Sequence, residues 1–339
     1  MIIVLKPGLS PKQEGAVIRE IRKRGYRPHI MRGVARTVIG AIGDELTHHS
    51  LETLVTAFPQ AVESVMPIQK RYKLVSREAH PANSTVRARD QIIGGPKFQI
   101  MAGPCSVESE RQLMTTATAV KKAGATFLRG GAFKPRTSPY EFQGLGEKGL
   151  KLLAKARRET GLPVVTELLS ENHVKLVAEY ADILQIGARN SQNFQLLIAA
   201  AKTGKPILLK RGLSMRIEEW LLAGEYVLAH GNSNLMFCER GIRTFETYTR
   251  NTLDLSAIPI VKRESHCPVV IDPSQGAGRA DLVAAMCKGA AAMGADALLI
   301  EVHPNPSEAW SDGAQQMTLD GFAKLMVELR PLITAAGRE

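Results

Sequence analysis

Leu128-Arg-Gly-Gly-Ala-Phe-Lys-Pro-Arg-Thr-Ser-Pro-Tyr140 is the stretch that decides the fold, because it shows in one place how the chain is built. An apolar run at 125–128 indicates a buried strand, and the glycine pair after Arg129 opens it into a loop. Two prolines preset the backbone of that loop. It presents two cations and two hydroxyls, Lys134, Arg136, Thr137 and Ser138. Fixed donors of these kinds bind phosphate esters, whereas a solvated basic turn would not need the rigid entry.

The same strand-then-polar-loop pattern recurs along residues 97–339. The predicted strands are 98–102, 126–129, 163–167, 183–187, 207–210, 235–239, 269–272 and 298–302. The predicted helices are 109–123, 147–160, 171–180, 192–202, 216–230, 254–264, 280–293 and 318–332. Eight strands, each followed by a helix, predict an α/β chain with a (β/α)8 TIM barrel. A doubly wound open sheet is the alternative, but it usually has fewer strands, and no Gly-x-Gly-x-x-Gly turn follows the first strand.

Residues 1–75 have a different pattern. Strands are predicted at 2–5, 28–31, 37–42 and 62–66, the last resuming at 72–75, with helices at 11–24 and 50–58. This βαββαβ order is that of a small ferredoxin-like domain. Residues 76–96 are predicted to be a polar linker that acts as a hinge. The expected organisation is therefore 1–75, 76–96 and a barrel over 97–339.

Composition restricts the class of protein. The chain is 44% hydrophobic and 23% charged, as expected for a folded soluble protein, and no apolar run approaches a membrane span. The start lacks the features of a signal peptide, and the four cysteines form no CxxC, which favours a cytoplasmic protein with free thiols. A net charge of +11 suggests anionic partners. Only 5% of residues are aromatic and no basic tract is interleaved with them, which argues against nucleic acid.

Cations recur at the predicted strand ends, where a barrel of this kind carries its functional groups. They are Arg129, Lys134, Arg189, Lys210 and Arg240. Each alone could be a surface ion-pair residue, but together on one rim their charges would repel. Bound phosphate or carboxylate groups would relieve that repulsion.

A second set of residues offers metal ligands. Cys105, Glu301 and Asp312 combine a thiolate with two carboxylates, a set that suits a divalent transition metal such as Mn, Fe, Co or Zn. A buried cysteine is also commonly a core residue, so spacing alone does not decide between the two.

Six stretches together resemble the 3-deoxy-D-arabino-heptulosonate 7-phosphate (DAHP) synthase family, in its short microbial form (type I beta) with a ferredoxin-like regulatory domain. They are Ala102-Gly-Pro-Cys-Ser-Val-Glu108, the 128–140 stretch, Gln185-Ile-Gly-Ala-Arg-Asn190, Leu208-Leu-Lys-Arg-Gly212, Cys238-Glu-Arg-Gly-Ile-Arg-Thr-Phe-Glu246, and Glu301-Val-His-Pro304 with Ser311-Asp-Gly313. The resemblance implies a transferase that condenses phosphoenolpyruvate with erythrose 4-phosphate and releases phosphate. This is the first step of the shikimate pathway to aromatic amino acids.

The resemblance also implies roles. The five rim cations would hold the phosphoenolpyruvate phosphate and carboxylate, and Pro135, Arg136, Thr137 and Ser138 would hold erythrose 4-phosphate. Lys134 would donate a proton to the new hydroxyl, and Glu167 would orient water or brace an arginine. The sister family, 3-deoxy-manno-octulosonate 8-phosphate synthase, has Asn-Arg-Ser-Ser where this chain has 135–138, so erythrose 4-phosphate is favoured over arabinose 5-phosphate. The sister activity remains the alternative.

One position departs from the family. The family's Asp-Pro-Ser-His supplies an imidazole to the metal, whereas this chain has Asp272-Pro-Ser-Gln275. The predicted site is Cys105, Gln275, Glu301 and Asp312, with the Gln275 amide oxygen as a weaker ligand, reduced affinity and a shifted metal preference. A metal-independent enzyme and a non-catalytic regulatory paralogue are the alternatives. His303 is expected to brace the site, and Trp310 and Phe245 to be packing residues.

For the front domain the resemblance implies feedback inhibition by tyrosine or phenylalanine, bound between such domains of a homotetramer. His29 is the candidate contact for the inhibitor, with an ordinary surface histidine as the alternative.

Overall fold

The computed structural model describes residues 1–33, 36–43, 49–66 and 71–339; residues 34–35, 44–48 and 67–70 lie outside the description. The chain divides into two compact units. The first comprises Met1–Asn83 with Glu264–His266, and the second comprises Ser84–Arg263 with Cys267–Glu339.

The first unit is built on a four-stranded antiparallel sheet in the order β2-β3-β1-β4. Its strands are β1 Ile2–Leu5, β2 Arg27–Arg32, β3 Thr37–Ile42 and β4 Val62–Met66. Helix α1, Pro11–Lys23, begins as predicted, with the Ser10 hydroxyl accepting from Gln13 N and proline in the first turn. The ferredoxin-like order is confirmed.

Two details of this unit differ from the prediction. The single helix predicted at 50–58 is two short helices, α2 His49–Glu52 and α3 Leu54–Ala57, separated at Thr53. The predicted resumption of a strand at 72–75 is wrong, because Leu74 and Val75 lie in a turn. Both are buried, so their apolar character reflects packing rather than strand pairing.

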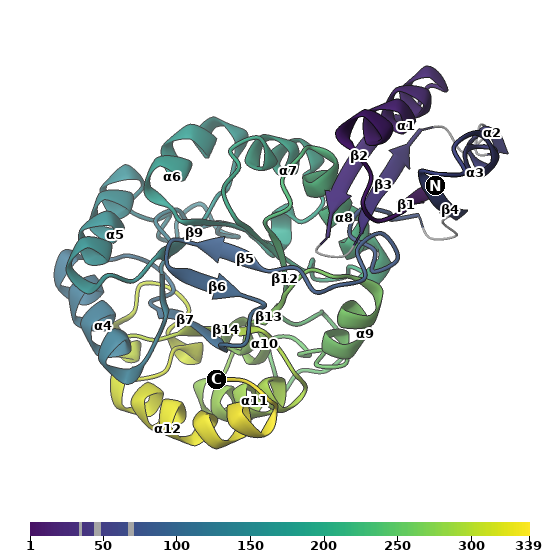
Figure 1. Ribbon diagram of the computed structural model, residues 1–339. Coiled ribbons are helices and arrows are strands. Elements are labelled where there is room, and N and C mark those ends of the chain that lie inside the picture. The colour runs from purple at the N-terminus through teal and green to yellow at the C-terminus, as the bar shows by residue number, and fades with distance from the viewer. Residues whose placement is uncertain (34–35, 44–48, 67–70) are drawn as a thin grey trace. The chain divides into compact units, whose positions relative to one another are not determined.

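The second unit is a closed parallel barrel, which confirms the predicted fold (Figure 1). Its strands are β7 Gln99–Gly103, β8 Phe127–Arg129, β9 Val164–Glu167, β10 Ile183–Ile186, β11 Ile207–Lys210, β12 Leu235–Glu239, β13 Val269–Ile271 and β14 Ala297–Glu301. Almost every strand residue is buried, because helices cover the outside of the sheet and its own side chains fill the inside. Pairing of β14 with β7 closes the ring.

The predicted helices surround this ring in Figure 1. They are α4 Glu110–Ala123, α5 Glu147–Thr160, α6 Val174–Tyr180, α7 Phe194–Ala201, α8 Ile217–Ala229, α9 Ala257–Glu264, α11 Ala280–Ala292 and α12 Leu319–Ala335. One further helix, α10 Pro273–Ala277, directly follows β13 and was not predicted. Asp272 caps it and Pro273 occupies its first turn. This short helix carries Gln275 to the carboxyl end of the barrel.

A hairpin closes the amino end of the barrel. Strands β5 Val86–Ala88 and β6 Gln91–Ile93 pair with each other and lie across the ring in Figure 1. Val86, Ala88 and Ile93 belong to the same apolar cluster as the residues that fill the barrel, including Phe127. The segment 76–96 thus differs from the expected linker in holding a hairpin that forms part of the barrel core.

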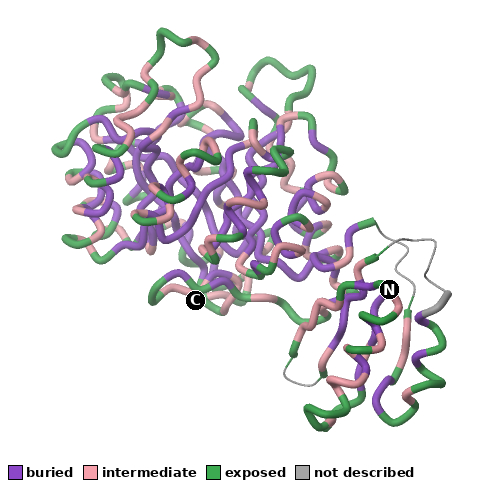
Figure 2. Tube along the Cα trace, turned by 90° about the horizontal axis from the view of Figure 1, so that it is seen from above, coloured by how far each residue is buried: buried purple, intermediate pink, exposed green. Residues whose placement is uncertain are grey.

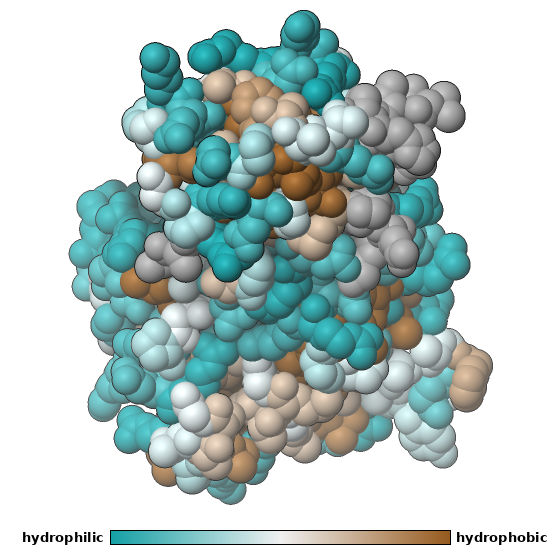
Figure 3. Space-filling model, turned by 45° about the vertical axis from the view of Figure 1, so that its right-hand side comes forward, coloured by the Kyte–Doolittle hydropathy of each residue, from teal (hydrophilic) through white to brown (hydrophobic). Residues whose placement is uncertain are grey.

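Burial follows this architecture. Figure 2 shows buried residues concentrated in the interior and exposed residues along the outer turns of the trace. The face drawn in Figure 3 is largely hydrophilic, with hydrophobic residues gathered in patches. Within the described residues, no helix has the combination of length and apolarity needed to cross a membrane.

Candidate active site

A cavity of about 230 Å3 opens at the carboxyl ends of the barrel strands. All five predicted rim cations line it: Arg129, Lys134, Arg189, Lys210 and Arg240. The predicted loop contributes Pro135, Arg136 and Thr137 to the wall, while Ser138 lies just beyond it. The folded chain therefore brings together, within one cavity, cations that are separated by more than 100 residues in sequence.

Arg129 is held by hydrogen bonds within the chain, but one of its N–H groups has no partner among the described residues. Its Nη1 donates to Pro104 O at 2.8 Å and to Glu301 Oε1 at 3.0 Å. Its buried Nε has no hydrogen-bond partner among the described residues, and the same holds for Nη1 of Arg240. Because buried donors are nearly always satisfied, two unpaired guanidinium N–H groups beside one cavity favour the binding of an anion there.

Glycine allows the strand ends to pack this closely. Gly103, at the end of β7, has a φ of 155°, and an added Cβ would lie 2.1 Å from Arg129 O. Gly187 follows β10, and an added Cβ there would lie 1.9 Å from Glu167 Oε1. At Gly103 the obstacle is backbone and the φ favours glycine, so this position excludes a side chain. At Gly187 the obstacle is the end of the Glu167 side chain, which would have to move to admit one. Glu167 is buried at the end of β9, lines the cavity and accepts from Gln185 Nε2 at 3.4 Å.

Like Lys210, Lys134 is a buried amine of the site. Its Nζ donates to Cys105 Sγ at 3.0 Å and to Cys105 O at 3.3 Å. Burial alone would lower its pKa, but the interactions with the adjacent Cys105 sulfur and the Glu301 carboxylate outweigh burial, and the pKa of Lys134 is raised. Lys134 is therefore protonated at neutral pH and can donate a proton.

The other cations are held by carboxylates or hydroxyls. Lys210 Nζ lies 2.5 Å from Asp272 Oδ2. Arg136 binds Glu141 through two nitrogens, at 2.9 and 3.2 Å, and Ser138 N donates to the same carboxylate at 3.4 Å. Arg189 Nη2 donates to Thr137 Oγ1 at 3.4 Å, which joins the rim to the 135–138 loop.

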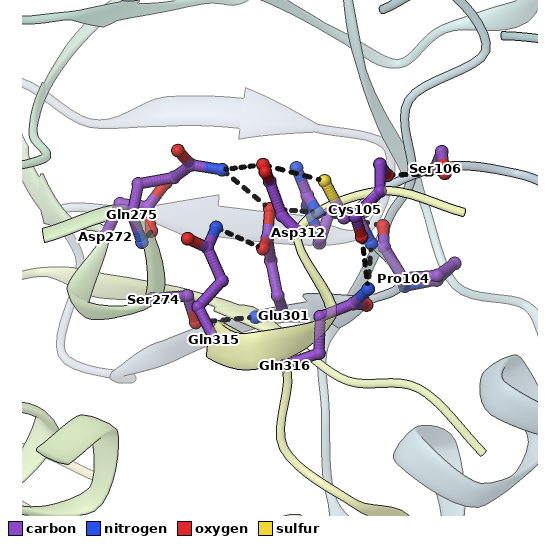
Figure 4. A network of polar contacts seen from close by, with 12 residues as sticks. Pro104, Cys105, Ser106, Asp272, Ser274, Gln275, Glu301, Asp312, Gln315 and Gln316 are labelled. Carbon is purple, nitrogen blue, oxygen red and sulfur yellow. Dashed lines mark hydrogen bonds and ion pairs between the residues drawn. The ribbon is translucent and has the colours of Figure 1, made fainter. Parts of the chain in front are cut away.

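Cys105, Glu301 and Asp312 form the predicted metal-binding group. Each offers one ligand atom, and these atoms all lie within 4.8 Å of one another (Figure 4). Burial and Glu301 raise the pKa of the Cys105 thiol to about 12, and its Sγ donates to Asp312 Oδ2 at 3.4 Å. Burial would raise the pKa of Asp312, but Arg250 and Lys134 outweigh it and lower that pKa to about 2. One thiol and two carboxylates at this spacing fit a divalent transition metal.

Gln275 joins this group through its amide nitrogen. Nε2 donates to Glu301 Oε1 at 3.0 Å and to Asp312 Oδ2 at 3.3 Å (Figure 4). Its Oε1 accepts from Arg240 Nη2 at 2.9 Å. The amide thus links the ligand carboxylates to a rim cation.

Two residues of the site were missed in the sequence. Gln315 Nε2 donates to Glu301 Oε2 at 2.7 Å, and Arg250 Nη1 reaches Gln315 Oε1 at 3.0 Å and Asp312 Oδ1 at 3.3 Å. Gln315 lies three residues after Asp312, and this spacing was a usable signal. Arg250 follows β12 in a long polar loop and has no local pattern that separates it from other surface arginines.

Comparison with known proteins decides the family. The model described as "DAHP synthetase I family" matches residues 75–335, and "DAHP synthase ferredoxin-like domain" matches residues 1–70. The chain belongs to the DAHP synthetase I family. It is 50% identical to phospho-2-dehydro-3-deoxyheptonate aldolase of Thermotoga maritima, over 99% of both chains. A crystal structure of DAHP synthase from that organism superposes with a TM-score of 0.79 at 49% identity, covering 100% of this chain and 98% of that one.

A more distant relative matches part of the chain. The 2-dehydro-3-deoxyphosphooctonate aldolase of Francisella tularensis is 33% identical over 73% of this chain and 96% of its own. A truncated form of the T. maritima DAHP synthase covers 79% of this chain with a TM-score of 0.75.

Within this DAHP synthase fold, the remaining predicted residues have different environments. His303 accepts from Asn305 N through Nδ1, so its Nε2 carries the proton toward Glu108 Oε2 at 3.2 Å. It ties down the loop after β14, as expected of a bracing residue. The packing role predicted for Phe245 is wrong, because this side chain is 97% exposed. Trp310 is 55% exposed and meets Phe142 edge to face.

His29 belongs to the front unit. It lies on β2, which is an edge strand of the sheet, and is opposite Gly40 on β3. Its side chain is partly buried, and burial together with the neighbouring Arg27 lowers its pKa. His29 is therefore neutral at physiological pH.

Proposed function

We propose that the chain condenses phosphoenolpyruvate with erythrose 4-phosphate to give DAHP and inorganic phosphate. The observation that carries this proposal is the pair of unpaired buried donors, Arg129 Nε and Arg240 Nη1, beside a cavity rimmed with cations. An anion would satisfy both donors, and both substrates supply phosphate. The full-length relative named phospho-2-dehydro-3-deoxyheptonate aldolase supports this choice over other pairs of anions.

The five rim cations, Arg129, Lys134, Arg189, Lys210 and Arg240, hold the phosphate and carboxylate of phosphoenolpyruvate in this proposal. The loop 135–138 holds the phosphate of erythrose 4-phosphate, through Arg136 and the hydroxyls of Thr137 and Ser138. The hydrogen bond from Arg189 to Thr137 supports a fixed spacing between the two anion sites. Holding two mutually repelling anions in reacting geometry is an orientation effect that lowers the barrier to their reaction.

The chain's own groups supply the proton chemistry. Carbon 3 of phosphoenolpyruvate attacks the aldehyde carbon, and protonated Lys134 donates a proton to the oxygen that becomes the new hydroxyl. Water adds at carbon 2 of the former phosphoenolpyruvate, and the tetrahedral intermediate expels phosphate. Glu167, buried at the cavity wall with one oxygen bound to Gln185, orients that water.

We also propose that Cys105, Glu301 and Asp312 hold a divalent metal of the Mn, Fe, Co or Zn class. The ligand atoms of these three residues lie close enough together to bind one such ion. When bound, the metal supplies Lewis-acid polarisation of the aldehyde. Gln275 occupies the position at which the family resemblance leads one to expect a fourth ligand.

Substrate consumption tests the proposed function. Chelator-stripped protein is supplied with phosphoenolpyruvate and erythrose 4-phosphate, with and without Mn2+, and phosphate release is measured. We expect release that Mn2+ restores. Faster release with arabinose 5-phosphate would favour the octulosonate-forming reaction, and binding of phosphoenolpyruvate without its consumption would favour a regulatory paralogue. Equal release in both metal conditions would favour a metal-independent enzyme.

For the front unit we propose inhibition by tyrosine or phenylalanine, with His29 as a contact, in a homotetramer located in the cytoplasm. The family match of residues 1–70 to a domain found with DAHP synthases supports a regulatory role, and the buried free thiols of Cys105, Cys238 and Cys287 suit a reducing compartment. His29→Ala is expected to weaken inhibition and leave uninhibited turnover unchanged. Inhibition that survives deletion of residues 1–75 would contradict this assignment.

A further inference from the structure

We propose that Gln275 acts as an internal substitute for the metal ion: its amide joins Glu301 and Asp312 and competes with a cation for them instead of ligating it. The inference rests on the proposed metal site and concerns how this chain modifies it. Gln275 would then be a positioning residue rather than a ligand.

The backbone of Gln275 is fixed on two sides. Its N–H donates to Asp272 Oδ1 at 2.9 Å, at the start of α10, and its carbonyl accepts from Asn251 Nδ2 at 2.9 Å. The side chain is buried and extends from this anchored turn into the ligand group (Figure 4). Rotation of the amide is therefore the main freedom that Gln275 retains.

The neighbours of the amide decide which way it faces. Its N–H2 donates to one oxygen of Glu301 and one of Asp312, and its oxygen accepts from Arg240. Turning the amide over would place its oxygen against two carboxylates and its N–H2 against a guanidinium. Three charge-assisted hydrogen bonds would become three repulsive contacts. The orientation that would offer the oxygen to a metal is thus strongly disfavoured while Arg240 is in place.

The amide and a metal would use the same lone pairs. Glu301 Oε1 already accepts from Arg129 and Gln275, and Asp312 Oδ2 accepts from Gln275 and the Cys105 thiol. A carboxylate oxygen has about two lone-pair directions in the plane of its group. An ion bonded to Cys105 Sγ replaces the thiol proton and so frees one lone pair of Asp312 Oδ2, but at Glu301 Oε1 it competes directly with the N–H2 of Gln275 and with Arg129.

A second amide, that of Gln315, binds the other oxygen of the Glu301 carboxylate. Arg250 donates to Gln315, whose own N–H2 donates to Glu301. Each ligand carboxylate also has a direct arginine partner, Arg129 for Glu301 and Arg250 for Asp312. The negative charge of the ligand group is thus balanced by side chains, so the group is stable without an ion.

The consequence is a metal site whose affinity is reduced by an internal competitor. Replacing the competitor by an imidazole, in Gln275→His, is expected to tighten Mn2+ binding by roughly ten- to hundredfold, the range seen when the surroundings of a metal site change. An affinity no higher than that of the unchanged protein would contradict the inference.

The decisive variant is Gln275→Leu, which removes both the donor and the oxygen. Chelator-stripped full-length protein is titrated with Mn2+ alone by calorimetry, and the melting temperature is measured with and without Mn2+. We expect Gln275→Leu to bind Mn2+ at least as tightly as the unchanged protein and to show a larger Mn2+-induced rise in melting temperature. Binding about tenfold weaker, with a smaller rise, would identify the Gln275 oxygen as a ligand. No Mn2+ binding in either protein would also overturn the inference.

Gln99→Leu is the matched control. Gln99 is also a buried glutamine on the barrel, but it lies at the amino end and donates to Ile92 O at 2.9 Å. This change is expected to leave both the Mn2+ affinity and the Mn2+-induced rise in melting temperature unaltered.

A crystal structure of the unchanged protein with Mn2+ keeps the inference testable should Gln275→Leu fail to fold. A Gln275 amide outside bonding distance of the ion and still hydrogen-bonded to Arg240 supports it, and an amide oxygen bonded to the ion overturns it. None of these measurements requires turnover. Mn2+ binding through Gln275 would overturn this inference alone, and an absence of phosphate release would overturn the proposed function alone.

Discussion

The two ends of the barrel use the same eight strands for opposite purposes. At the amino end, the β5–β6 hairpin adds Val86, Ala88 and Ile93 to an apolar cluster. At the carboxyl end, buried charges surround a cavity and two of their donors have no partner among the described residues. One end contributes apolar burial, which stabilises the fold, and the other retains polar groups whose full satisfaction requires a ligand. Changes at the two ends should therefore separate stability from activity.

The largest effect is expected at the carboxyl end. Lys134→Met removes the buried proton donor while keeping a side chain of similar length. We expect turnover to fall by roughly 10²- to 10⁴-fold, the usual contribution of a general acid. Steady-state kinetics measure the fall, and Lys202→Met, an exposed lysine at the end of α7, is the control expected to leave turnover unchanged. An active Lys134→Met protein would show that another group supplies the proton.

The reverse result is expected at the amino end. Ile93→Ala truncates a fully buried side chain of the hairpin and should lower the free energy of unfolding by about 3 kcal/mol. Turnover below the melting transition should change little, because Ile93 lies at the end of the barrel opposite the cavity. Denaturant unfolding and kinetics on the same sample check both parts. A large loss of turnover in the folded protein would contradict the separation of the two ends.

A smaller effect is expected for the free energy of unfolding at acidic pH, to which the Asp312 carboxylate at the carboxyl end contributes. Asp312 has a pKa lowered from 3.8 to about 2, with Arg250 as the main stabilising charge. Its contribution is therefore present above pH 4 and is lost as the pH falls through 2; it amounts to roughly 2 kcal/mol. Asp312→Asn removes this dependence, and asparagine tolerates the φ of 49° at this position.

Unfolding of chelator-treated protein between pH 4 and pH 2 measures the difference. The unchanged protein should lose more stability over this interval than Asp312→Asn. Equal losses would show that Asp312 titrates normally.

The smallest effect is expected at the cavity mouth. Glu141 binds Arg136 and the N–H of Ser138 as a substrate phosphate would, but in an exposed loop. Glu141→Gln should lower the KM for erythrose 4-phosphate by about two- to fivefold, because exposed ion pairs are weak competitors. The KM for phosphoenolpyruvate serves as the internal control and should stay the same. A higher KM for erythrose 4-phosphate would indicate that Glu141 assists binding.

The sequence predicted the barrel because each strand is a short apolar run that ends in a polar loop. It did not reveal the hairpin, since Val86–Ala88 and Gln91–Ile93 have only three residues each and their burial depends on the barrel beneath them. Helix α10 was missed for a related reason. It has only five residues, of which one is proline and one is glycine, and so short a segment shows no helical periodicity. Asp272-Pro273 is nevertheless a helix-start signal.

The candidate site was predictable in its residue types but not in its connections. The rim cations follow strand ends, so barrel geometry alone brings them together. The orientation of the Gln275 amide depends on Arg240 after β12, Glu301 at the end of β14 and Asp312 in the loop after β14, and no local pattern encodes that arrangement. Arg250 could not be predicted either, because its contacts with Gln315 and Asp312 depend on the folded arrangement of the loops.

The close packing of Gly103 against Arg129 and of Gly187 against Glu167 has a consequence for how this enzyme can diverge. In a library that randomises both glycines and the cavity wall and selects for activity on longer sugar phosphates, Gly103 should remain invariant among the survivors, because backbone stands where its Cβ would lie. Gly187 should admit a side chain only where Glu167 shifts. Variation should collect first at Glu141, which borders the cavity and is partly exposed, so new substrates are more readily reached from the loop.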